Sequence, residues 1–113
     1  MLTVAEVRKL ALSLDEAVEL PHFERTSFRV NKKIFATMLE KENTAVLLLS
    51  PEDQSVFCAY DKTKMYPVPN KWGKKGATIV VLKKVRKDIF KDALITAYCR
   101  VAPEKLASKY RSE

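Results

Sequence analysis

The segment that decides the fold comprises residues 27–49, with the sequence SFRVNKKIFATMLEKENTAVLLL. Its first four residues alternate between polar and apolar, which is the two-residue period of a strand with one buried face. Returning strands are predicted at residues 34–40 and 44–49, and the second is apolar on both faces, as expected at the centre of a sheet. Asn31-Lys32 is predicted to form the first tight turn, because Asn tolerates left-handed backbone. The sequence thus predicts a three-stranded antiparallel meander, with Lys41-Glu42-Asn43 as its second turn.

A helix is predicted before the meander. Thr3 and Glu6 have the spacing of a capping box, in which each side chain satisfies a free amide of the first helical turn. Apolar residues then recur at helical spacing, which predicts a helix over residues 4–14 with a possible further turn through Val18.

Helical and extended segments alternate after the meander. Ser50-Pro51 is a strong helix start, and this helix is expected to reach Ala59 and to bury Val56. The other predicted elements are a loop over residues 60–72 with a short extended piece at 64–68, a turn between Gly73 and Gly76, a strand at 77–82, an amphipathic helix at 89–101 and a last short helix opening at Pro103.

These elements give the order α-βββ-α-(β)-β-α-α. We therefore predict an α+β fold, a two-layer α/β sandwich with a mostly antiparallel sheet. The chain has 113 residues, 47% of them hydrophobic, with only two Gly and five Pro. This size and composition predict a single domain over residues 1–113.

Positive charge is concentrated in one part of the chain. Residues 62–91 contain ten basic residues and one acidic residue, a net charge of +9, whereas residues 1–61 carry −3 and residues 92–113 carry +1. Clustered Lys and Arg repel one another unless an anion lies over them. The sequence therefore predicts a polyanionic partner, namely nucleic acid, with DNA as the expected form.

Few residues offer other chemistry. Cys58 and Cys99 lie in apolar helical patterns and are expected to be reduced thiols in a cytoplasmic protein. One His is too few for a zinc site, and no nucleophile motif or phosphate-cradling Gly loop occurs, so we expect no metal, no cofactor and no enzymatic activity. An enzyme would need His22 as general base with Glu24 or Asp61 as its partner. No segment has the pattern of a signal peptide or membrane span, and we expect a monomer without a membrane partner.

Four segments resemble a known family. They are residues 28–36, 47–52, 68–73 and 97–98, with the sequences FRVNKKIFA, LLLSPE, VPNKWG and AY. In this order they resemble the MmcQ/YjbR-like family of small bacterial proteins. The resemblance implies a compact fold grouped with the secretion-chaperone-like folds and described as a double wing, and family members are commonly labelled DNA-binding. One departure is the first hairpin turn, where members often have Gly and this chain has Asn31-Lys32.

Two basic loops are candidate wings that would grip a phosphate backbone. Trp72 would stack on bases beside the second wing; alternatively, it packs in the core and the lysines only solvate the surface. The candidate residues are Arg29, Lys32 and Lys33 at the first wing, Lys71, Trp72, Lys74 and Lys75 at the second, and Lys62 and Lys64 between them.

A second basic run precedes the long helix and contains Lys83, Lys84, Arg86 and Lys87. Positive charge there opposes the helix macrodipole, so the run either binds anions or is neutralised by Asp88 and solvent. The leading prediction is a non-enzymatic nucleic-acid-binding module that contacts phosphates through basic hairpin wings. The alternative is a protein-binding adaptor of chaperone-like fold that uses an exposed sheet face or edge.

Overall fold

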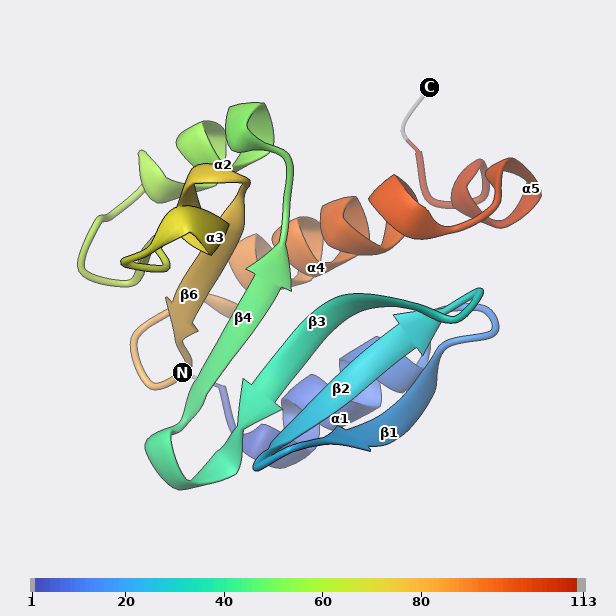
Figure 1. Cartoon of the computed structure of the whole chain (residues 1–113), viewed down its shortest axis with the longest axis horizontal. Helices are drawn as coiled ribbons and strands as arrows, with labels where there is room; N and C mark the ends of the chain where they lie inside the picture. Colours follow the sequence, from blue (N-terminus) through green and yellow to red (C-terminus); the bar gives the residue numbers. More distant parts are fainter. Residues whose placement is uncertain (1, 112–113) are drawn as a thin grey trace.

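A computed structural model describes residues 2–111 and shows a six-stranded antiparallel sheet with the strand order β1-β2-β3-β4-β6-β5 (Figure 1). The strands are β1 (Val18–His22), β2 (Arg25–Val30), β3 (Lys33–Leu39), β4 (Thr44–Leu48), β5 (Met65–Pro67) and β6 (Ala77–Val81). The helices are α1 (Val4–Leu12), α2 (Pro51–Cys58), α3 (Lys71–Lys74), α4 (Lys87–Val101) and α5 (Glu104–Ala107), with a 3-10 turn, η1 (Glu40–Glu42), between β3 and β4. The predicted α+β class and antiparallel sheet are confirmed.

The two long helices cover one face of the sheet. Figure 1 shows α1 and α4 behind the sheet, whereas only the short α3 lies in front of it, over β6. The core lies between the sheet and the two long helices, and its largest fully buried residues include Phe28, Phe35, Met38, Leu47, Phe90, Leu94 and Tyr98. We call the opposite side of the sheet the open face. By register, one row of residues on that face crosses all six strands: Leu20, Ser27, Thr37, Val46, Ile79 and Tyr66.

The N-terminal helix is shorter than predicted, and a strand follows it. The capping box is present, with the Glu6 amide donating to Thr3 Oγ1 at 3.1 Å and the Thr3 amide donating to Glu6 Oε1 at 3.0 Å. The helix ends at Leu12, and the positive φ of Glu16, 60°, turns the chain into β1. The predicted extension through Val18 is therefore wrong. Pro21 lies in β1, where it is tolerated because β1 is an edge strand.

The first hairpin turn has the backbone expected of a type I′ turn. Asn31 and Lys32 both have positive φ, 52° and 67°. Lys32 thus occupies the position that usually favours Gly. The register of β2 against β3 shifts between Phe28 and Arg29, because Phe35 is an extra, bulged residue between their partners on β3. Phe35 packs edge-on against Tyr98, with ring centroids 5.5 Å apart.

The second helix begins as predicted, but its buried side differs from the prediction. The Ser50 hydroxyl accepts a hydrogen bond from the Asp53 amide, and Pro51 occupies the first turn. Val56, predicted to be buried, is exposed, whereas Gln54 is buried with its amide bonded to backbone carbonyls. A polar residue can occupy this position because its side-chain amide reaches carbonyl oxygens of α3 and of the first residue of β6.

Both cysteines are free, as predicted. Burial raises the pKa of the Cys58 thiol and of the Cys99 thiol, which lowers the thiolate fraction at neutral pH. Within residues 2–111, no helix combines the length and apolar character needed to cross a membrane.

Candidate nucleic-acid interface

The predicted turn between Gly73 and Gly76 is present, since the Gly76 amide donates to the Gly73 carbonyl oxygen at 3.1 Å, and the residues before it form the one-turn helix α3. Asn70 caps it, its side-chain Oδ1 accepting from the Trp72 amide at 2.8 Å. Gly73 fits closely against the chain before it, since a Cβ there would lie 1.8 Å from the carbonyl oxygen of Val68. Gln54 Nε2 donates to the carbonyl oxygens of Gly73 at 2.9 Å and Ala77 at 3.0 Å. Residues 70–76, which we call the knob, therefore form a fixed segment between β5 and β6 rather than a flexible hairpin tip.

α3 and its C-cap carry exposed cationic side chains and one exposed aromatic ring. The alternative in which Trp72 packs in the core is wrong, because 57% of this residue is exposed. The Lys75 ammonium lies over the indole, 5.2 Å from the ring centroid. Lys71, Lys74 and Lys75 are all exposed, and no ion pair to a carboxylate within residues 2–111 involves them. Lys71 and Lys74 also line a groove of about 580 Å³ beside α3.

The open face of β2 supplies two guanidinium groups. Arg25, Ser27 and Arg29 are at alternate positions of the strand, so their side chains share one face. Arg29 Nε donates to Ser27 Oγ at 3.0 Å, and Ser27 Oγ donates to the carbonyl oxygen of Leu20 at 2.8 Å, which holds Arg29 along the strand. Arg25 Nη1 is buried and has no hydrogen-bond partner in the part of the chain that the structure describes. An unpaired buried cationic donor of this kind is costly unless it meets an acceptor.

The strands place no carboxylate on the open face. Glu19 is the only acidic residue within β1 to β6. Its carboxylate accepts from Arg8 Nε of α1 at 2.9 Å, so it points to the helical side of the sheet. This pair, with a second contact from Glu40, raises the pKa of Arg8. The charges that the strands contribute to the open face are consequently all positive.

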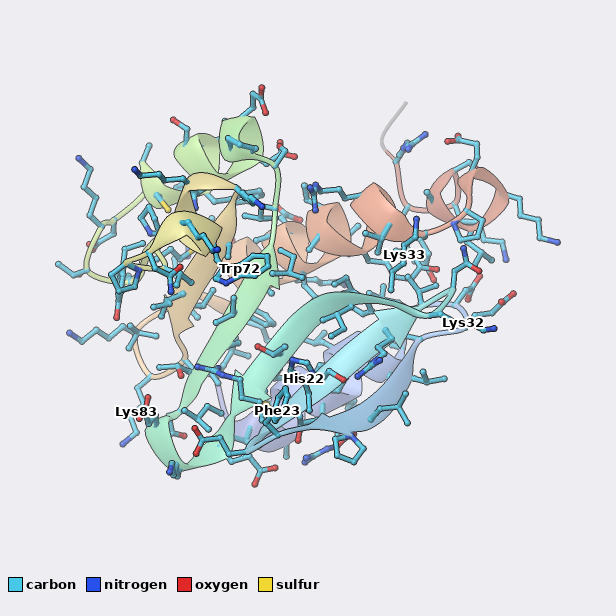
Figure 2. The ribbon with its side chains drawn as sticks, in the orientation of Figure 1. His22, Phe23, Lys32, Lys33, Trp72 and Lys83 are labelled. Carbon is cyan, nitrogen blue, oxygen red and sulfur yellow. The ribbon has the colours of Figure 1, made fainter. Side chains whose placement is uncertain are left out.

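The other predicted bases lie elsewhere. Lys32 and Lys33 are at the β2–β3 turn, and Figure 2 shows them across the sheet from Trp72. The predicted position of Lys62 and Lys64 between the two turns is wrong. The Lys64 carbonyl accepts from the Val81 amide at 2.9 Å, which places these residues at the opposite end of β6 from α3. The reason is that β5 pairs antiparallel with β6, so the residues just before β5 lie beside the last residue of β6 at the edge of the sheet.

The run before α4 joins Lys62 and Lys64 to form a second basic region, the α4 end. Lys64, Asp61 and Arg86 line one cavity of about 220 Å³, which shows that the two segments meet. Lys64 pairs with Asp61 at 3.7 Å, Arg86 with Asp88 at 2.8 Å and Lys87 with Glu6 at 3.5 Å. Hydrogen bonds from Thr63 and the charge of Lys64 lower the pKa of Asp61, which keeps it ionised. Much of this charge is therefore neutralised within the protein.

Sequence reasoning missed two residues of the open face, Arg25 and Phe23. Neither residue is among the candidates from sequence, because the first predicted strand starts at residue 27 and β1 is not predicted. The signal was present, since Arg25 continues the alternation of Ser27 and Arg29. Phe23 is 94% exposed at the β1–β2 turn, with φ 59°, and packs edge-on against His22 at 5.0 Å. Figure 2 shows Phe23 and Trp72 on the same side of the sheet.

His22 and Asp61, paired in the enzyme hypothesis, are far apart in the fold. His22 ends β1 at one edge of the sheet, whereas Asp61 precedes β5 at the other edge. Four strands lie between β1 and β5, so the two side chains cannot act as a hydrogen-bonded pair.

Comparison with known proteins identifies the family. Residues 12–100 match the family model YjbR. The chain belongs to the YjbR family. The matched range contains all six strands and most of α4, so the open face and α3 are both parts of the YjbR domain.

A solved structure shares the YjbR fold of this chain. It is the crystal structure of Deinococcus radiodurans protein DR2400, whose domain is designated DUF419. The two chains are 18% identical with a TM-score of 0.74, over 96% of this chain and 88% of that one. The likeness shows the fold alone. A comparison with curated proteins gives no match.

Proposed function

We propose that this chain is a non-enzymatic nucleic-acid-binding module, with DNA as the expected ligand, that contacts the phosphate backbone through α3 and the open face. The observation that carries the proposal is the one-sided charge of this surface. It has three lysines on α3 and its C-cap that form no ion pair within residues 2–111, and two arginines on β2, and the strands add no carboxylate to it. Phosphates are the anions that such a spread of separate cations suits.

The surface favours backbone contacts over base-specific reading of a duplex. The two long helices are on the other side of the sheet, and α3 has only four residues. The major groove is read by a helix or a two-stranded ribbon that enters it, and α3 is too short to serve as such a helix. Contacts from long, separate side chains to phosphates carry no sequence information themselves. Binding is accordingly proposed to have little sequence preference.

The salt dependence of binding tests this proposal. Titration of a fluorescent DNA oligonucleotide at several salt concentrations should give a log–log slope of about −4.5 when five cations engage phosphates, and about −3.5 for single strands. The five are Arg25, Arg29, Lys71, Lys74 and Lys75. Absence of binding at 50 mM salt would refute the proposal.

One observation favours the alternative of a protein-binding adaptor. β1 is an edge strand, and Val18, Leu20 and Phe23 expose apolar surface on and beside it. Such an edge can pair with an extended segment of another chain. Replacing Val18 and Leu20 by Thr should abolish binding to a protein partner and leave the affinity for DNA unchanged within about twofold. The opposite pattern would assign the surface to nucleic acid.

A further inference from the structure

We infer that the open face binds single-stranded nucleic acid, with unpaired bases stacking on the exposed rings of Trp72 and Tyr66. This inference rests on the proposed function and names the form of nucleic acid that the surface accepts. It follows from the aromatic residues and the shape of the face, which the phosphate contacts alone do not explain.

The aromatic rings are exposed beside the cations. Trp72 is 57% exposed on α3, and Tyr66 is 36% exposed on β5. Tyr66 is at the end of the row that crosses the open face, opposite Ile79 of β6. In a duplex the bases are stacked on one another, so only an unpaired base can offer its flat side to these rings.

The face between the rings and β2 suits bases rather than a duplex backbone. Its central row carries the half-buried apolar side chains of Val46 and Ile79, whereas Thr37 and Ser27 further along the row are buried. The arginines of β2 lie on the same face, about three strand spacings from β6, or about 14 Å. A strand crossing the sheet from Trp72 would therefore meet aromatic and apolar surface first and guanidinium groups next. Phe23 offers a further exposed ring at the far corner of this path.

The cations are placed to hold the phosphates of stacked bases. The Lys75 ammonium is 5.2 Å from the Trp72 ring centroid, so a nucleotide stacked on the indole brings its phosphate close to a positive charge. Lys71 and Lys74 flank the same ring in the chain and have no ion pair within residues 2–111. Alternation of cations and aromatic rings is the pattern by which proteins bind single strands with little sequence preference.

The single tryptophan makes the inference directly measurable. Trp72 is the only Trp in the chain, so intrinsic tryptophan fluorescence reports this ring alone. We expect a twelve-residue oligo(dT) to quench the fluorescence and to bind at least tenfold more tightly than a twelve-base-pair duplex at equal salt. Oligo(U) in a parallel titration distinguishes RNA from DNA as the source of the same single-stranded chemistry.

Substitutions separate stacking from charge. Trp72→Ala should weaken oligo(dT) binding about tenfold, the loss expected for one stacked base, and should change duplex binding less than twofold. Trp72→Phe should keep most of the affinity, because the phenyl ring still stacks. Tyr60→Ala is the matched control, since Tyr60 is 64% exposed but follows α2, at the α4 end. Circular dichroism of each variant checks that it is folded.

The possible outcomes are distinct. Preferred binding of oligo(dT) or oligo(U), with quenching of Trp72 fluorescence in the unsubstituted protein and an affinity for labelled oligonucleotide that Trp72→Ala lowers and Tyr60→Ala does not, supports the inference. Duplex binding that equals or exceeds single-strand binding, without a change in fluorescence, overturns the inference and leaves the proposed function standing. Binding of neither form at 50 mM salt overturns both.

Discussion

The two ends of β6 carry basic residues in different surroundings. Before Ala77, α3 holds three exposed lysines without ion pairs in the described chain, next to an exposed Trp72. At the Val81 end of β6, the α4 end holds six basic residues, of which Lys64, Arg86 and Lys87 have carboxylate partners. In the sequence both groups belong to one run with a net charge of +9. Pairing and neighbouring rings, rather than the number of charges, distinguish the α3 end as the better candidate for nucleic acid.

The largest effect is expected from Gly73→Ala, which would break the α3 end. The new Cβ would lie 1.8 Å from the Val68 carbonyl oxygen, so the backbone of the knob must shift. We expect the free energy of unfolding to fall by about 2–3 kcal/mol and nucleic-acid binding to weaken with it. Urea unfolding measures the first. Lys74→Ala, an exposed position one residue further on, should leave stability within about 0.5 kcal/mol.

Gln54→Ala should loosen the same knob by a smaller amount. The buried amide donates to two carbonyl oxygens that fix α3 to β6, and its loss leaves both less well satisfied. We expect a loss of about 1–2 kcal/mol in unfolding free energy. Ser55→Ala, at the exposed next position of α2, is the control. Equal stability of the two variants would mean that the knob is not held by this amide.

Removing a carboxylate from the α4 end should raise the affinity for nucleic acid rather than lower it. Asp61→Asn frees Lys64 from its ion pair, so the affinity for oligo(dT) should rise about twofold at 0.01 M salt, where a Debye length of about 30 Å leaves the α4 end unscreened. Asp92→Asn removes the same charge from an exposed position on α4 and should raise the affinity less. Equal increases would show that total charge, and not pairing, sets the affinity.

Lys32→Gly should have the smallest effect and the opposite sign on stability. Lys32 has φ 67°, a conformation that costs a side-chain-bearing residue more than it costs Gly. We expect a gain of about 0.5–1 kcal/mol in thermal or urea unfolding, with binding changed less than twofold. Lys33→Gly removes the same charge from β3, where Gly should instead lower stability by about 0.5–1 kcal/mol. A loss of stability in both variants would contradict this account of the turn.

The fold was largely predictable because its elements have strong local signals. The capping box at Thr3, the Ser50-Pro51 helix start and the alternation in residues 27–49 each satisfy backbone or bury apolar surface locally. β1 was not predictable in this way, because Pro21 argues against a strand until its place at the sheet edge is known. The helical form of α3 depends on a cap, on a close packing contact of Gly73 and on Gln54 from another element.

The candidate site was predictable in composition and not in arrangement. Lys71, Trp72, Lys74 and Lys75 are adjacent in sequence and stay together in the fold. Arg25 and Arg29 join the same surface only through the order of strands in the sheet. Ion pairs between residues distant in sequence, such as Lys87 with Glu6, neutralise bases that the sequence counts as available. These pairings depend on tertiary packing, which a charge count along the chain does not contain.

The most direct test compares two charge reversals of equal size. Lys74→Glu with Lys75→Glu changes the α3 end by four charges, and Lys83→Glu with Lys84→Glu changes the α4 end by the same amount. At 0.1 M salt the Debye length is about 10 Å, so a distant reversal is largely screened. We predict that the first pair weakens oligonucleotide binding more than tenfold and the second less than threefold. Equal losses from the two pairs would contradict the assignment of binding to the α3 end.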